Sequence, residues 1–165
     1  MAEDSIAVGV IVEKRKAASP WIDHTWSPVA VLPGLPEAAP MTLIETLPDG
    51  ERYYAGAARI TLASVDTANY RDNMMSGAPK LWVAMREDHP DAGLILVAVT
   101  ADPAEGEAHT ETGTNIVDTV PMVPEIAHFV AQFVDMHHVE REFFKRKRDR
   151  ADPDRLARRP MGKEG

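Results

Sequence analysis

Residues 6–16 have the pattern of a strand that is apolar on much of both faces, with Ala7 and Ile11 on the second face, until the charged residues begin. Because successive side chains of a strand point to opposite faces, one face carries a continuous apolar row: Ile6, Val8, Val10 and Val12. The charged run of residues 13–16 is expected to reach water. A loop is predicted over residues 17–27, and Val29–Leu32 forms a short second strand that ends at Pro33-Gly34.

Two further segment pairs have the pattern of antiparallel hairpins. Thr42–Leu47 and Arg52–Leu62 flank Pro48-Asp49-Gly50, where the Asp-Gly step is expected to supply the positive φ of a tight turn. Lys80–Arg86 and Leu94–Thr100 are two apolar strands joined by a polar turn. The order of these segments predicts pairing between neighbours along the chain.

Three segments have helical patterns. Ser64 is expected to cap a helix over Val65–Met75, and a short helix is predicted over Pro103–Thr112. The third helix begins near Val123 and places apolar residues at helical spacing as far as His137. Ile116–Val120 is interpreted as an extended link. The predicted fold is α+β: a mostly antiparallel sheet of five or six strands with two or three helices, the long C-terminal helix packing on the sheet.

Charge divides the chain into two parts. A length of 165 residues fits one domain. The net charge of -8 is distributed unevenly along the chain. Residues 1–138 hold 8 Lys and Arg against 20 Asp and Glu, whereas residues 139–165 hold 10 against 6. We therefore predict a single acidic α+β domain over residues 1–138 and a basic, partly disordered arm over residues 139–165. An acidic body disfavours nucleic-acid binding, since phosphates would be repelled.

Several classes of chemistry lack their usual residues. The chain has no cysteine, which excludes disulfides and thiolate metal sites, and it contains no phosphate-binding glycine loop or nucleophile-elbow motif. His137 and His138 are adjacent, so on a helix they diverge by roughly 100° and do not predict a metal site. No cofactor is expected. The N-terminal residues do not resemble a signal peptide and no apolar run reaches about 20 residues, which predicts a cytoplasmic protein without a membrane span.

The first candidate site is the segment between two tryptophans. It contains Trp21, Asp23, His24 and Trp26. In a functional interpretation, His24 acts as a general base or ligand that a carboxylate orients. In the favoured packing interpretation, both indoles cover one end of the sheet and Asp23 accepts an indole N–H.

The second candidate site lies in the basic arm. Two aromatic residues precede four consecutive cations: Phe143, Phe144, Lys145, Arg146, Lys147 and Arg148. This segment could bind the acidic body of its own or a sister chain, an anionic polymer or membrane surface, or a groove on a protein partner. It could equally be a solvated helix end.

Several stretches are similar to the bacterial family called domain of unknown function 3305. The most distinctive are VGVIVEKRKAASPWIDHTWSPVAVLPG near the start and HHVEREFFKRKRDR near the end; RYYAG, TANYRDN, VTADP and VDTVPM lie between them. The resemblance covers about residues 6–150 and brings no catalytic residues with it. Its members are often encoded beside formate dehydrogenase subunits and their chaperone, which implies an accessory role.

Three functions of different classes follow. The first is an accessory or assembly protein that binds another protein through Phe143–Arg148. The resemblance implies a role in formate dehydrogenase maturation, with a subunit or its chaperone as partner. The alternative is a small enzyme or ligand-binding domain that uses the Trp21–Trp26 segment. A second alternative, nucleic-acid binding through the basic tail, is disfavoured by the acidic body.

Overall fold

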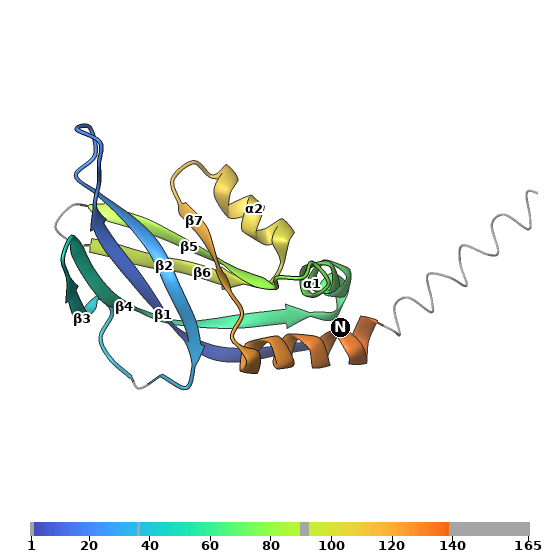
Figure 1. Cartoon of the computed structure of the whole chain (residues 1–165). Coiled ribbons are helices and arrows are strands. Elements are labelled where there is room, and N and C mark those ends of the chain that lie inside the picture. The colour runs from blue at the N-terminus through green and yellow to red at the C-terminus, as the bar shows by residue number, and fades with distance from the viewer. Residues whose placement is uncertain (1, 36, 90–92, 139–165) are drawn as a thin grey trace, which may run out of the picture.

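The computed structural model describes residues 2–35, 37–89 and 93–138 (Figure 1). Its strands, in chain order, are β1 (Glu3–Lys16), β2 (His24–Pro33), β3 (Thr42–Leu47), β4 (Gly50–Ala63), β5 (Lys80–His89), β6 (Gly93–Thr100) and β7 (Ile116–Pro121). The helical segments are a 3-10 turn (Ser64–Asp66), α1 (Thr67–Met74), α2 (Pro103–Glu111) and a C-terminal helix at residues 124–138.

The strands form two antiparallel sheets, so the fold is α+β but the predicted single sheet is wrong. One sheet has four strands in the order β2-β1-β4-β3, and the other has three in the order β6-β5-β7. The segment interpreted as an extended link, Ile116–Val120, lies in β7 and pairs with β5. Since β4 lies against β6 and β2 against β7, the two sheets enclose a common core.

The core is built from alternate residues of both sheets and one face of the C-terminal helix. Val10 and Val12 of β1, like Leu81 and Val83 of β5, are fully enclosed. The C-terminal helix adds four residues to the same cluster: Ile126, Val130, Phe133 and Val134. Their spacing follows the predicted apolar stripe, which confirms that this helix packs on the sheets. Among the described residues, no helix is long and apolar enough to cross a membrane.

The hairpin of β3 and β4 is confirmed, although its glycine has a different role from the one predicted. Gly50 does not adopt a positive φ; it pairs with Leu47 at the start of β4. A Cβ atom at Gly50 would lie 1.9 Å from the carbonyl oxygen of Lys14. Glycine is therefore required because β4 approaches β1 closely at this point, and not because of the turn.

The helix predicted after Asp102 is confirmed as α2. The Asp102 carboxylate accepts a hydrogen bond from the Ala104 amide at 2.9 Å, as an N-cap residue does. On its inner face, Gly106 is packed so closely that an added Cβ would lie 2.3 Å from Cγ of Trp82. This contact seats α2 on the outer face of the three-stranded sheet.

The helix predicted from Ser64 begins later. Ser64 lies in the 3-10 turn, and its hydroxyl accepts a hydrogen bond from the amide of Ala2 at 3.2 Å. The α-helix itself runs over Thr67–Met74. Ser64 thus ties the N-terminal strand to the end of β4 instead of capping α1.

Candidate functional site

The tip of the β1–β2 hairpin exposes a large apolar surface. Trp21 is 90% exposed and the neighbouring Ile22 is 53% exposed. The amide of Trp21 donates to the Ser19 hydroxyl at 3.1 Å, so a local turn supports the tip. The hairpin projects beyond the two sheets (Figure 1). The expectation that both indoles pack on one end of the sheet is therefore wrong for Trp21.

Trp26 has the opposite environment because β2 begins at His24, within the predicted loop. The strand turns Trp26 toward the core, where it is 7% exposed and its ring centroid lies 5.9 Å from that of Tyr53. The ammonium of Lys14, its register partner on β1, lies 5.5 Å from the indole centroid. The structure thus separates the two tryptophans that the sequence suggested would act together.

Glu87 of β5 is the polar partner of this segment, and sequence reasoning missed it. Its Oε2 atom lies 2.8 Å from Nε2 of His24 and accepts the indole N–H of Trp26 at 3.2 Å. The hydrogen bond to His24 is the main reason why the pKa of Glu87 is lowered. Asp23 was expected to accept the indole proton; it is exposed and does not do so. The sequence could not predict the contacts of Glu87 with His24 and Trp26, because Glu87 is distant in sequence and lies on the other sheet.

His24 also borders a shallow depression of about 440 Å³. Its lining is largely charged and includes Lys14, Arg15, Asp23 and Asp49. An imidazole held by a carboxylate at such a place has the elements of a general base. The same contact joins β2 to β5 and has a structural use without any substrate. The enzyme or ligand-binding interpretation of His24 stays a prediction.

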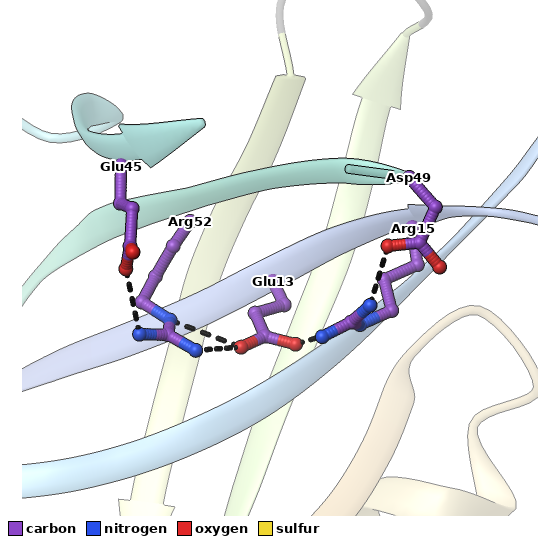
Figure 2. Close-up of polar contacts among 5 residues, drawn as sticks. All are labelled: Glu13, Arg15, Glu45, Asp49 and Arg52. Carbon is purple, nitrogen blue, oxygen red and sulfur yellow. Dashed lines mark hydrogen bonds and ion pairs between the residues drawn. The ribbon is translucent and has the colours of Figure 1, made fainter. Parts of the chain in front are cut away.

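A row of five charged side chains crosses the outer face of the four-stranded sheet (Figure 2). Glu13 and Arg52 are register partners on β1 and β4, and Arg52 also faces Glu45 on β3. Arg15 lies two residues beyond Glu13 on the same strand face and bridges Glu13 and Asp49. The row therefore alternates in charge, in the order Glu45, Arg52, Glu13, Arg15, Asp49.

Glu13 was expected to reach water, and this is wrong. It is 8% exposed, with Oε1 accepting from Nε of Arg15 and Oε2 accepting from Nε of Arg52, both at 2.9 Å. A second Arg52 nitrogen, Nη2, also donates to Oε2. These guanidinium contacts, led by Arg52, lower the pKa of Glu13 against the opposing effect of burial. The alternation of strand faces, which pairs Glu13 with Arg15, was the available sequence signal.

Two other predictions of the sequence bear on the site. Within residues 2–138 as far as they are described, no group of three or more His, Asp or Glu side chains could hold a metal ion. His137 instead packs against Phe133 in a tilted arrangement, with ring centroids 4.4 Å apart. The predicted partner-binding residues Phe143–Arg148 lie outside the described residues.

The fold defines a two-sheet α+β domain with an exposed hairpin tip and a charged row on one sheet. Residues 7–148 match the family model described as "Protein of unknown function (DUF3305)". The chain belongs to this family, as its resemblance indicated, and the matched region includes the basic segment through Arg148. No curated protein and no solved structure shows significant similarity to the chain.

Proposed function

We propose that this protein is a cytoplasmic accessory protein that binds another protein through its hairpin tip and its basic arm. The observation that carries the proposal is the 90% exposure of Trp21 at the tip of a projecting hairpin. Adjacent Ile22 extends this apolar surface. Tryptophan is among the residues that contribute most to binding free energy at protein interfaces.

The exposure of Trp21 has a cost in free energy that a partner could remove. An indole in water forgoes roughly 1.5–3 kcal/mol that burial of a large apolar side chain provides. The tip residues gain nothing from the core, because the ordered turn holds Trp21 away from it. A partner with an apolar pocket would recover that free energy, and Lys16, exposed beside the tip, would favour an acidic rim around the pocket.

The basic arm supplies the second contact in this proposal. Phe143 and Phe144 would enter apolar pockets, and Lys145–Arg148 would steer the approach to an acidic surface. The family match extends through this segment, which supports treating it as part of the working protein. The candidate partner, a formate dehydrogenase subunit or its chaperone during maturation, comes from the family resemblance.

The test is affinity purification at native expression level, with recovered proteins identified by mass spectrometry. Three chains are compared with the wild type: Trp21→Ala with Ile22→Ser, a chain ending at His138, and Met75→Ala. Met75 is a matched control because it is 68% exposed and apolar but lies after α1. Formate dehydrogenase subunits should be recovered with the wild type and Met75→Ala and be depleted with the other two. Equal recovery with all four chains would refute both contacts.

A further inference from the structure

An acidic groove with an apolar floor lies where the C-terminal helix meets the start of β1. It encloses about 530 Å³. The lining residues are Glu3, Asp4, Phe129, Gln132, Phe133, Asp135, Met136 and His137. In Figure 1 the N-terminus lies beside the last turns of this helix, in agreement with that lining.

The floor of the groove is apolar and incompletely covered. Met136 is 69% exposed, although it lies next to the core residue Phe133. Phe129 is half-buried and packs against the same core. An apolar floor of this kind favours an occupant with apolar side chains, since covering it removes further surface from water.

The rim of the groove is acidic. Glu3, Asp4 and Asp135 are all exposed, and they belong to two different elements that converge on the same opening. Oδ1 of Asp4 accepts a hydrogen bond from the Ser5 amide at 2.9 Å, and the side chain stays exposed. The rim therefore favours an occupant that carries cationic side chains next to its apolar ones.

We propose that the groove binds the segment Phe143–Arg148 of the same molecule. The two phenylalanines match the floor, and the four cations that follow match the three rim carboxylates. No other segment of the sequence places adjacent aromatic residues directly before a cationic run. Two independent properties of the groove, its floor and its rim, thus agree with one stretch of chain.

Chain length permits the contact within one molecule. The helix is described to residue 138, and five residues to Phe143 can span about 17 Å when extended. The groove residues Phe129 and Met136 are seven residues apart, or about 10 Å along a helix axis. A short tether of this kind also gives the segment a millimolar effective concentration, which favours its own groove over that of another molecule.

Docking would hide the arm from a partner until the partner competes for it. This regulatory meaning rests on the proposed function, whereas the docking is measured on the isolated protein. Failure of the docking test therefore leaves the binding of a partner at the hairpin tip unaffected, and the two failures can be told apart.

The test uses the absence of cysteine from the natural chain. Gln132→Cys in the groove and Asp149→Cys after the basic run are introduced together into the full chain and treated with a short bismaleimide cross-linker. We expect a link within one molecule. Non-reducing electrophoresis separates the monomer from linked dimers, and intact mass spectrometry of the monomer detects the link. Adding Asp4→Asn and Asp135→Asn should lower the yield of this link roughly fivefold, since two ion pairs are lost.

A matched control adds Asp72→Asn and Asp118→Asn, which remove two exposed carboxylates outside the groove lining. This control should retain the link. Thermal unfolding by circular dichroism verifies that each variant is folded, and the exposed positions of all four aspartates make that the expected result. Linked dimers would show that the groove takes the arm of a second copy. Equal yields of the link in all variants would indicate that the two cysteines meet only by collision of a tethered chain. Linked dimers, equal yields or the absence of any link would each overturn the proposal.

Discussion

Glu13 and Arg52 face each other across β1 and β4, with Nε of Arg52 donating to Oε2 of Glu13 at 2.9 Å. Glu13 is buried, while Arg52 retains partial exposure and a second partner in Glu45. The carboxylate is therefore the central member of a row that spans three strands, and it is the acceptor that both guanidinium groups share.

Removing Glu13 should destabilise the fold. Glu13→Ala leaves Arg15 and Arg52 without their shared acceptor, and we expect the free energy of unfolding to fall by about 1–3 kcal/mol. Urea denaturation measures this difference. Glu45→Ala is the matched control, because Glu45 is exposed at the end of the same row and an exposed pair contributes roughly 0–1 kcal/mol. An equal loss of unfolding free energy in the two variants would show that the buried Glu13 contributes no more than the exposed Glu45.

The same row predicts a pH dependence. The pKa of Glu13 is lowered in the folded protein, whereas a glutamate in the unfolded chain titrates near 4.5. Protons therefore bind preferentially to the unfolded chain in this range, so the contribution of Glu13 is complete above about pH 4.5 and is lost as pH falls through the lowered folded pKa.

The measurement compares wild type with Glu13→Gln by urea denaturation at neutral pH and at stepwise lower pH. The difference in unfolding free energy should narrow on acidification. Glu87, whose pKa is also lowered, is present in both proteins and its effect cancels. A difference that stays constant or widens would contradict the assignment.

The contact between Gly106 and Trp82 predicts that a larger residue displaces α2. Gly106→Ala should gain up to about 1 kcal/mol of helix propensity, but its Cβ would overlap the indole, and overpacking costs roughly 1–3 kcal/mol. We expect a net loss of stability in thermal unfolding. In a Trp82→Leu background, Gly106→Ala should cost less stability than it does in the wild type, because the smaller side chain makes room for the added Cβ. Simple additivity would argue against a direct clash.

Asn73 holds α1 to the three-stranded sheet through its buried amide group. Its Nδ2 donates to the carbonyls of Lys80 and Ala101 at 2.8 and 3.0 Å, and its Oδ1 accepts from the Lys80 amide. Asn73→Asp would place a carboxylate against two carbonyl oxygens, and we expect a loss of at least about 2 kcal/mol by urea denaturation. Asn69→Asp, one turn earlier and less buried, should change stability by less than half as much. Comparable losses would show that charge on α1 is the cause.

Local patterns predicted the elements well because their causes are local. The strand face of Val8, Val10 and Val12, the short helix α2 and the apolar stripe of the C-terminal helix all follow from residues close in sequence. The division into two sheets was missed because it depends on which distant strands pair. The strand β7 is short, and only its pairing with β5 identifies it.

The site was predicted less well than the fold. His24 and Trp26 share the carboxylate of Glu87, which is more than sixty residues away in the sequence, so local patterns could not identify this partner. Trp21 was assigned to packing because aromatic residues usually bury their area, and only the geometry of the hairpin reveals its exposure. Phe143–Arg148 stay a prediction from sequence, outside the described residues.

The proposed function depends above all on contact between Trp21 and a partner. Isothermal titration of the purified chain against the partner subunit recovered by affinity purification tests it most directly. Trp21→Ala should weaken binding by about 2 kcal/mol, roughly 30-fold in Kd, while Met75→Ala leaves Kd within about twofold of the wild type. A Trp21→Ala chain that binds with the wild-type Kd would contradict the account.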